Sequence, residues 1–575
     1  MNYELLLLAA FMLAGPAKAQ HLPATEDSPE PLHVAPQADT AQWDTLDEGL
    51  HLTWASRDEH YAVHEVPQVT LQTEAVVRAW RGERTNIQAV LFSRNDLGRL
   101  SLRMTPVRKG RKGRWAEARF VNYLITDGHK WCGQHSMDMP TWLVPDIIDL
   151  DKPHAVNARQ TRPVWCTIEV PHDARPGRYD THLEVLDERG KVTGSLLLHI
   201  DVNHRTLPRP HEQRFHLDLW QQPYAVSRYY GLERWSPEHI EALRPYLKAL
   251  GRAGQKVVSA IMFYEPWGDQ SHDKFSAMIQ STKHKDGTWT YDYTIFDRYV
   301  TLCAECGIDA QINCYSMVPW DMTFRYYDEA QGRDIDLKTT TQTPEYRELW
   351  ENFLKAFRKH LEEKGWFDKT RIAMDERAEA DMLNAYRIAK EAGFRMALAG
   401  NYHASLTDKL HDYSVAPTQV AHFKAEERAL RKAQGLTTTF YTCCAEVEPN
   451  IYSNSLPAEA AFLPLHAAAN DLDGYLHWSW INWDDHPLTD SRFRLFGSGD
   501  TYNFYPGPRS SVRFERLIEG IQQYEKVQVL KQEWQHDPIR LARLESLLQE
   551  CQAFGRSGKS CAETVNKIET FLNEE

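Results

Sequence analysis

Hydrophobic and polar positions follow two different patterns along this chain, and the change falls near Leu207-Pro-Arg-Pro210. Before that point, short runs rich in β-branched and aromatic residues are separated by turn residues such as Asn95-Asp96 and Pro176-Gly177. Several short strands with this punctuation are typical of a β-sandwich. We therefore predict a β-sandwich over residues 66–206.

After the boundary, apolar strand-like segments alternate with amphipathic helical segments, which predicts a mostly parallel sheet. Helical spacing is clear at 237–253, 345–363 and 378–392. Eight strands with intervening helices are the count of a (β/α)8 TIM-like barrel, which we place at 207–510. A charged helical segment at 511–575 is expected to pack on it. The eight predicted strands lie at 215–220, 257–263, 308–315, 371–375, 394–399, 413–415, 437–443 and 474–480.

The first residues resemble a secretory signal. An apolar run at 5–13 precedes Ala17-Lys18-Ala19, which has the small-x-small pattern of a cleavage site. The run is too short to span a bilayer, and no later segment is long enough. We therefore predict a signal peptide at 1–19, cleavage near Ala19-Gln20, and a periplasmic or secreted protein. The polar stretch at 20–65 is predicted to be a linker and approach segment.

Composition narrows the function classes. The chain has 575 residues, enough for several domains, and a net charge of −14, which argues against nucleic acid as the main partner. Its 18 Trp and 25 Tyr serve either as core or as flat platforms for sugar rings.

Nine cysteines permit disulfides, with Cys551–Cys561 and Cys132–Cys166 as candidate pairs. The pair Cys303-x-x-Cys306 is interpreted as buried thiols. Oligomeric state is not indicated.

The candidate catalytic residues are Asp375 and Glu376. They end the apolar segment 371–374 and stand directly before a helix start at Ala378. In α/β barrels the chemistry is placed at the carboxyl ends of the strands, so this position selects the pair from the other Asp-Glu dipeptides of the chain.

Other polar and aromatic residues follow the remaining predicted strands and are expected to converge on the same mouth. Amides and acids suit sugar hydroxyl groups, whereas aromatic rings suit the apolar face of a sugar, so a glycan is the expected partner. The substrate-binding candidates are Asp218, Trp220, Asn313, Tyr315, Asn401, Tyr441, His477, Trp478, Trp480, Asn482 and Trp483.

Adjacent carboxylates favour one mechanism. Two-carboxylate retaining glycosidases hold their acids about 5–5.5 Å apart across the scissile bond, usually on different strands. Neighbours fit substrate assistance better, in which the 2-acetamido oxygen of the sugar attacks its own anomeric carbon. No metal site and no nucleotide cofactor are expected, because neither a His-Glu-x-x-His motif nor a phosphate-binding glycine-rich loop after a strand is present.

The sequence resembles glycoside hydrolase family 123, from the group once labelled domain of unknown function 4091. The resemblance is carried by motifs that together cover nearly the whole mature chain: Ala79-Trp-Arg-Gly-Glu-Arg84 leading to Gln88, Val170-Pro-His-Asp-Ala-Arg-Pro-Gly-Arg-Tyr179, Met374-Asp-Glu376, Asp473-Gly-Tyr-Leu-His-Trp-Ser-Trp480, Gly499-Asp-Thr501, Tyr505-Pro-Gly-Pro508, and the segment from Arg513 to Glu525.

This resemblance implies a β-sandwich followed by a (β/α)8-like barrel and a retaining β-N-acetylgalactosaminidase that uses substrate assistance. It implies that Asp375 positions the acetamido group and stabilises the oxazolinium-like intermediate. Glu376 would be the general acid and then the base. The chain departs from the family pattern at Arg377, where proline is common.

Two alternatives remain from the residues themselves. One is a glycosidase for another sugar that uses two remote carboxylates, with Glu446, Asp484 and Asp485 as candidates for the second acid. The other is a non-catalytic carbohydrate-binding protein on the same barrel. Hydrolysis of substrates without an acetamido group would favour the first, and sugar binding without turnover would favour the second.

Overall fold

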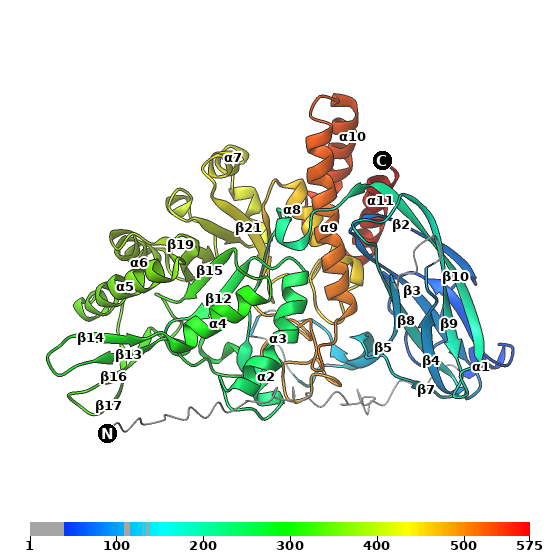
Figure 1. Cartoon of the computed structure of the whole chain (residues 1–575), viewed down its shortest axis with the longest axis horizontal. Coiled ribbons are helices and arrows are strands. Elements are labelled where there is room, and N and C mark those ends of the chain that lie inside the picture. Colours follow the sequence, from blue (N-terminus) through cyan, green and yellow to red (C-terminus); the bar gives the residue numbers. More distant parts are fainter. Residues whose placement is uncertain (1–39, 108–114, 130–131, 134–136) are drawn as a thin grey trace, which may run out of the picture.

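The computed structural model describes residues 40–107, 115–129, 132–133 and 137–575. The predicted signal peptide lies outside these residues. The described chain forms an N-terminal all-β part and a second part built on an eight-stranded parallel sheet. Figure 1 shows the two side by side, with helix α9 (Val512–Glu533) between them.

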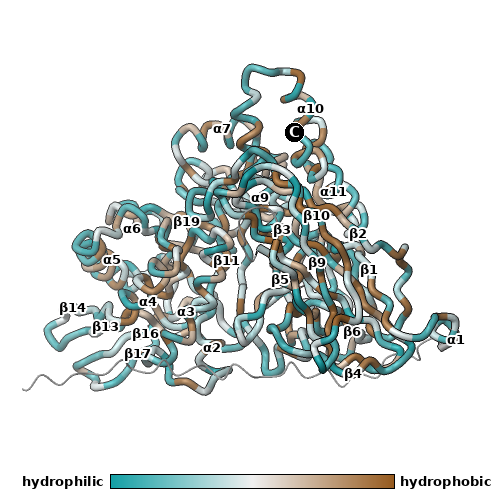
Figure 2. The backbone as a smooth tube through the Cα atoms, turned by 45° about the vertical axis from the view of Figure 1, so that its right-hand side comes forward, coloured by the Kyte–Doolittle hydropathy of each residue, from teal (hydrophilic) through white to brown (hydrophobic). Residues whose placement is uncertain are grey.

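The N-terminal part is a sandwich of two five-stranded sheets. Alternation of buried and exposed side chains favours this arrangement: in β9, Tyr179, Thr181 and Leu183 are buried, whereas Arg178, Asp180 and His182 between them are exposed. Figure 2 shows hydrophobic stretches along β5, β9 and β10. One sheet has the order β1 (His51–Ala55), β3 (Arg84–Ser93), β8 (Gln160–Glu169), β5 (Ala116–Asp127) and β6 (Thr141–Ile148). The other has the order β2 (Glu74–Arg81), β10 (Val192–Thr206), β9 (Gly177–Leu186), β4 (Gly98–Met104) and β7 (His154–Val156).

The segment predicted as a linker, 20–65, is partly structured, so that prediction is wrong for its second half. It contains α1 (Thr40–Asp44) and β1, which pairs antiparallel with β3 from His51↔Phe92 to Ala55↔Gln88. Trp54 of β1 is buried in the sandwich core. Its single short strand among polar residues gave too weak a periodicity to be distinguished from a linker.

All eight strands predicted after residue 207 are present, and all pair in parallel. Their spatial order is β11, β22, β21, β20, β19, β18, β15, β12. Their bounds are β11 (His216–Leu219), β12 (Val257–Ile261), β15 (Gln311–Tyr315), β18 (Thr370–Met374), β19 (Arg395–Ala399), β20 (Asp412–Val415), β21 (Thr437–Thr442) and β22 (Gly474–His477).

The sheet curls into a nearly closed barrel whose seam lies between β11 and β12. There the backbone ladder is reduced to one bridge, Leu217↔Gln255. Side-chain amides replace the missing bonds: Gln255 Oε1 accepts from Leu219 N at 2.9 Å, and Gln221 Oε1 accepts from Ser259 N at 2.8 Å. Buried backbone groups at the seam are thereby satisfied without a continuous ladder.

Helices cover most connections between the strands. Helix α5 begins at a Thr343 cap that accepts from Tyr346 N and ends at Gly365, whose φ of 70° suits glycine. The connection from β19 to β20 carries only the 3-10 turn Ala404–Leu406, so one expected helix is missing. The helices are α2 (Pro223–Tyr229), α3 (Pro237–Arg252), α4 (Thr294–Glu305), α5 (Pro344–Lys364), α6 (Glu379–Glu391), α7 (Ala425–Ala433) and α8 (Pro457–Ala469).

A second, smaller sheet was not predicted. The connections after β12 and after β15 each contribute a hairpin, and the two pair through β13 and β16 to give the order β14, β13, β16, β17. The strands are β13 (Gln280–Lys283), β14 (Trp289–Asp292), β16 (Thr323–Asp328) and β17 (Arg333–Lys338). In Figure 1 this sheet projects beside α5.

The C-terminal helices are α9, α10 (Pro538–Leu548) and α11 (Gly558–Glu574). Helix α9 packs on α8 of the barrel part and also against β3 and β6 of the sandwich. Buried ion pairs fix it to the sandwich: Arg513 with Asp146 at 2.9 Å and Lys526 with Glu83 at 2.6 Å. Within the described part of the chain, none of the helices has the length and apolarity required to cross a bilayer.

Candidate functional site

The carboxyl ends of the barrel strands surround a cavity of about 370 Å³. This is the edge at which parallel α/β sheets bind their ligands. Strand ends and the loops after them supply most of the wall, and the β5–β6 loop of the sandwich supplies the rest. The lining residues are Cys132, Gly133, Trp220, Trp267, Gln270, Trp320, Asp375, Glu376, Ala399, Tyr441, Cys443, Cys444, Leu476, Trp478, Leu495 and Phe496.

Asp375 follows β18 and is 7% exposed. Trp320 Nε1 donates a hydrogen bond to its Oδ2 at 2.7 Å, whereas Oδ1 is buried with no protein partner. Burial raises the pKa of Asp375 to about 7, opposed by the Trp320 hydrogen bond and the Arg377 charge and assisted by Glu376. One oxygen is thus fixed by the protein and the other is available to a donor on a ligand.

Glu376 is the next residue, and its side chain is exposed at the same cavity. The hydroxyl of Tyr441, at the end of β21, donates to Glu376 Oε1. Burial, together with the Glu376 charge, raises the pKa of Tyr441 well above its usual value, so this hydroxyl keeps its proton. The two acids therefore share one cavity but have different partners and different exposure.

Aromatic rings form the wall beside Asp375. Trp220, at the end of β11, stacks on Trp267 with ring centres 5.1 Å apart. Both contact the ring of Tyr315, at 4.7 and 5.3 Å. Stacked rings of this kind present a flat apolar surface of fixed orientation.

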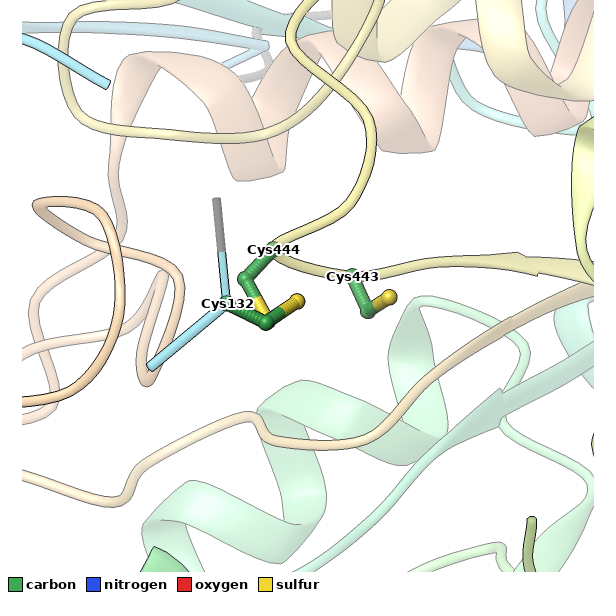
Figure 3. A group of neighbouring side chains, drawn as sticks. All are labelled: Cys132, Cys443 and Cys444. Carbon is green, nitrogen blue, oxygen red and sulfur yellow. A yellow bond between two sulfur atoms is a disulfide. The ribbon is translucent and has the colours of Figure 1, made fainter. Parts of the chain in front are cut away.

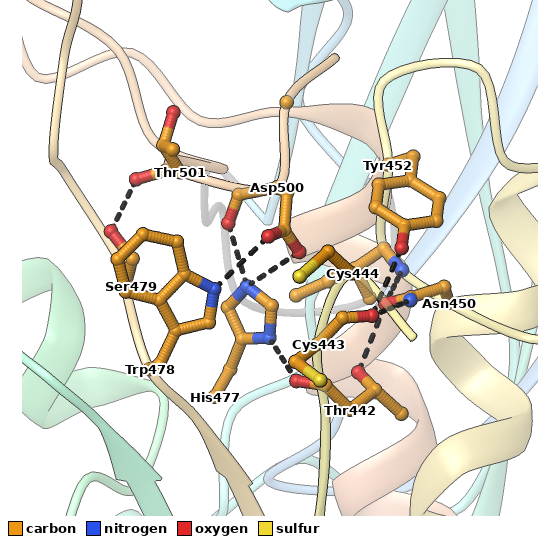
Figure 4. A network of polar contacts seen from close by, with 12 residues as sticks. Thr442, Cys443, Cys444, Asn450, Tyr452, His477, Trp478, Ser479, Asp500 and Thr501 are labelled. Carbon is orange, nitrogen blue, oxygen red and sulfur yellow. Dashed lines mark hydrogen bonds and ion pairs between the residues drawn. The ribbon is translucent and has the colours of Figure 1, made fainter. Parts of the chain in front are cut away.

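Trp478, which follows β22, forms another part of the wall. Its Nε1 donates to Asp500 Oδ2 at 3.0 Å, and Nε2 of the preceding His477 lies 2.8 Å from the Asp500 carbonyl oxygen. Figure 4 shows both rings directed at Asp500, with Nδ1 of His477 directed at the carbonyl oxygen of Thr442. Burial raises the pKa of Asp500 to about 7 and lowers that of His477 to about 4.

Three cysteines contribute to the cavity wall (Figure 3). A disulfide joins Cys132 of the sandwich to Cys444 of the barrel, and the Cys443 thiol lies beside it. Their sulfur atoms lie within 4.8 Å of one another, the one such cluster of metal-binding side chains among the described residues. Because two of the three sulfurs are bonded to each other, the cluster offers a metal only one thiol. The pairs considered from sequence are wrong, since Cys166, Cys551 and Cys561 are free.

The structure brings together some predicted site residues and separates others. Asp375, Glu376, Trp220, Tyr441 and Trp478 line the cavity. Tyr315 is buried behind Trp220. Asp218 and Asn313 lie two residues earlier on their strands than Trp220 and Tyr315, and both are 2% exposed inside the barrel, below the cavity.

The other predicted binding residues do not line the cavity. His477 is buried against Asp500. Asn401 lies after β19, where its Oδ1 accepts from Gln419 at 2.6 Å. Trp480 and Trp483 are fully buried; they pack against Phe504 and Tyr246, respectively. Asn482 Oδ1 accepts from His272 N at 2.9 Å. After β22 the chain turns into the core, which takes Trp480, Asn482 and Trp483 away from the cavity.

None of the remote acids considered as alternatives lines the cavity. Glu446 is engaged by Cys443 N at 3.0 Å, and burial raises its pKa. Burial likewise raises the pKa of Asp484 to about 8, whereas Asp485 forms an ion pair with Arg228 at 3.5 Å. The geometry therefore disfavours a mechanism with two remote carboxylates.

Trp267 and Trp320 line the cavity but were not predicted from the sequence. Each follows a proline, in Pro266-Trp267 and Pro319-Trp320, a few residues after a predicted strand. This repeated pair at two strand ends is the signal that could have identified them. Cys132, Gly133, Leu495 and Phe496 come from distant loops and carry no such signal.

Comparisons with known proteins agree with this geometry. A family model for the glycoside hydrolase 123 catalytic domain matches residues 220–530, and one for the glycoside hydrolase 123 N-terminal domain matches residues 54–187. A family 123 glycoside hydrolase from Clostridium perfringens, solved in a study of glycolipid glycan hydrolysis, gives a TM-score of 0.82 at 25% identity, over 91% of this chain and 97% of that chain.

Two further solved structures resemble the chain only weakly. A β-glucuronidase from Parabacteroides merdae gives a TM-score of 0.29 at 9% identity, over 83% of this chain and 52% of that chain. The SrpA adhesin of Streptococcus sanguinis gives 0.16 at 11% identity, over 43% of this chain and 94% of that chain. Both values are too low to indicate a shared fold. No curated protein matches the chain.

Proposed function

Because this chain belongs to glycoside hydrolase family 123, we propose that it removes terminal β-linked N-acetylgalactosamine from glycans and retains the anomeric configuration. The acetamido group of the sugar supplies the nucleophile. The observation that carries the proposal is the pair of neighbouring carboxylates at one cavity, one buried with an unpartnered oxygen and the other exposed.

Asp375 acts on the acetamido group. Its Oδ1 accepts the amide N–H, which turns the amide oxygen towards the anomeric carbon and stabilises the positive charge that the amide gains in the cyclic oxazolinium ion. Trp320 holds Oδ2 and so fixes the carboxylate plane. The ionised form is required for this role, because a neutral acid stabilises a developing cation far less.

Glu376 moves the proton. As the bond between the amide oxygen and the anomeric carbon forms and the glycosidic bond breaks, Glu376 donates its proton to the departing oxygen. The same carboxylate then removes a proton from the water that attacks the anomeric carbon and opens the ring. Tyr441 holds Oε1 throughout, which leaves Oε2 for the leaving group and the water.

The walls suit a single sugar with an apolar substituent. A volume of about 370 Å³ is at the lower end of ligand pockets, which fits an exo-acting enzyme. Trp220, Trp267 and Trp320 would enclose the acetamido methyl group beside Asp375, and Trp478 would stack on the ring. The clostridial relative was studied for glycolipid glycan hydrolysis, so glycolipid glycans are the first natural substrates to test.

Fold and location complete the proposal. The barrel is a (β/α)8 variant in which a 3-10 turn replaces the helix between β19 and β20. The protein is exported to the periplasm or secreted, in line with the apolar run at 5–13 and with a disulfide between its two parts.

The test is turnover of a chromogenic β-N-acetylgalactosaminide. We expect Glu376→Gln to lower kcat by about 10²–10⁴-fold, the usual contribution of a general acid. Asp375→Asn should lower it comparably. Asp368→Asn is the matched control, because Asp368 precedes β18 and its side chain is 94% exposed. If wild type and Glu376→Gln hydrolyse the substrate equally, the assignment is wrong.

Two further substrates separate this function from its alternatives. The β-N-acetylglucosaminide differs only at carbon 4, and the β-galactoside lacks the acetamido group. Hydrolysis of the β-galactoside at a comparable rate would exclude substrate assistance. Calorimetric binding of an N-acetylgalactosamine thiazoline without turnover of any substrate would indicate a binding protein instead.

A further inference from the structure

Arg377, the residue after the acid pair, folds back onto the tryptophan that holds Asp375. Its guanidinium carbon lies 4.9 Å from the centre of the Trp320 ring, and its Nη2 donates to the Trp320 carbonyl oxygen at 3.3 Å. Trp320 in turn donates to Asp375 Oδ2. Contacts thus run from Arg377 through Trp320 to Asp375.

We propose that Arg377 is a positioning residue: it holds the Trp320 ring against Asp375, so that the Asp375 carboxylate stays oriented towards the acetamido group, and it places a positive charge beside that carboxylate. This inference rests on the proposed function, which gives the ionised Asp375 its role. It adds a residue that does not line the cavity and acts only through its neighbours.

The positive charge of Arg377 opposes the effect of the neighbouring negative charge on Asp375. Glu376 is adjacent, and its charge disfavours ionisation of Asp375, whereas the charge of Arg377 favours it. Tyr315 of β15 also packs near this site. The charges that act on Tyr315 are carboxylates, including those of Asp218 and Asp412, so its surroundings add no cation that could favour ionisation of Asp375. Among the described residues, no carboxylate lies within ion-pair distance of Arg377, so its charge is not neutralised by a partner.

The geometry requires an arginine rather than any cation. A guanidinium is planar, so it can lie over an indole ring and still direct an N–H at the carbonyl oxygen of the same residue. An ammonium group would keep the charge but lose the stacking. Arg377 therefore makes two contributions that can be separated: its positive charge near Asp375, and its stacking and hydrogen bond with Trp320.

Three variants separate these contributions: Arg377→Met removes the charge at similar length, Arg377→Lys keeps it, and Trp320→Phe removes the indole N–H. The readout is the pH profile of kcat/KM. We expect Arg377→Met to move the acid limb upwards, by up to about 1 pH unit for loss of a nearby opposite charge. Trp320→Phe should move it in the same direction.

Arg377→Lys should leave the acid limb near its wild-type position while lowering kcat, because the charge stays and the stacking is lost. The matched control is Arg387→Met, which removes an exposed arginine from the following helix α6. An acid limb that is the same in Arg377→Met as in Arg387→Met would overturn the inference.

A second measurement does not depend on turnover. The fluorescence of wild type minus that of Trp320→Phe reports the ring bonded to Asp375, and its pH titration should disappear in Asp375→Asn. In the Arg377→Met background the midpoint should move upwards; an unchanged midpoint would overturn the inference. If the wild type hydrolyses no β-N-acetylgalactosaminide, the proposed function fails, while this titration still decides the role of Arg377.

Discussion

Burial of the Asp375 carboxyl group disfavours its ionised form. The side chain is 7% exposed, and burial is the main reason that its pKa rises from 3.8 to about 7. Trp320 and Arg377 oppose this rise but do not cancel it. A carboxyl group in this position makes the folded protein less stable at neutral pH, which is common where a site serves chemistry rather than folding.

Replacement of Asp375 by asparagine should change how the stability of the protein depends on pH. Between about pH 4 and pH 7 the folded state retains the Asp375 proton while the unfolded chain releases it, so wild-type stability falls as pH rises through this window. The asparagine variant has no such loss. We expect it to be more stable at pH 7.5, on the order of 1–4 kcal/mol, and nearly equal to wild type at pH 4.

Calorimetric unfolding at the two pH values measures this difference. Asp368→Asn, an exposed substitution before the same strand, should show no such pH dependence. An Asp375→Asn protein that gains as much stability at pH 4 as at pH 7.5 would show that the gain does not come from the proton.

For single residues, the sequence allowed some of the candidates to be placed at one cavity and misplaced others. Asp375, Glu376, Trp220, Tyr441 and Trp478 were found because each stands at a strand end. Asp218 and Asn313 were misplaced because two residues along a strand give the same face at a different depth in the barrel. Trp267 and Trp320 lie in loops after two strands; the Pro-Trp pair repeated there marks both residues, but the paths of these loops depend on tertiary pairing.

Among the elements, the loop after β22 holds one wall of the cavity. Asp500 lies 22 residues beyond Trp478 and accepts its indole N–H. It is fully buried, so its carboxylate and the indole N–H depend on each other for a partner. This loop sets the position of Trp478, and with it the surface proposed to stack on the sugar.

We therefore predict that Asp500→Ala raises KM about 10-fold, because loss of one buried hydrogen bond costs about 1–1.5 kcal/mol. The effect on kcat should be smaller, since the proposed role of Trp478 is to stack on the sugar ring and not to act on the departing oxygen. Asp500→Asn keeps an acceptor oxygen and should remain near wild type. Michaelis kinetics of the three proteins, with Asp471→Ala as an exposed control, test this. An unchanged KM in a folded Asp500→Ala protein would contradict it.

The elements themselves were largely predictable. The barrel strands are buried runs flanked by amphipathic helices, a strong local signal, and all eight were found. The sheet of β13, β14, β16 and β17 was missed because its strands are short and partly exposed, and because its two hairpins are separate in sequence. Pairing across such a separation is a tertiary event.

For the molecule as a whole, the Cys132–Cys444 disulfide connects the two parts at the cavity. The cysteines are 312 residues apart, so spacing gave no hint of the pairing. We predict that Cys132→Ser/Cys444→Ser lowers unfolding stability by about 2–5 kcal/mol and raises KM, because the β5–β6 loop no longer holds its wall.

Thermal unfolding and Michaelis kinetics with and without a phosphine reductant provide the test. Reduction should move the wild type towards the double variant and leave the double variant unchanged. A wild type that keeps its KM after verified reduction of the disulfide would show that the loop holds its place without the covalent bond.

The contacts of helix α9 limit how the sandwich and the barrel could be exchanged between proteins in evolution. Its Arg513, Arg516 and Lys526 are buried and paired with Asp146, Asp58 and Glu83 of the sandwich. Without the sandwich, Arg513 and Lys526 would lose these carboxylate partners, whereas Arg516 would keep Glu519 of the same helix. A barrel transferred alone to another protein would therefore carry an α9 whose sandwich-facing side lacks its partners, so the two parts could not be exchanged independently.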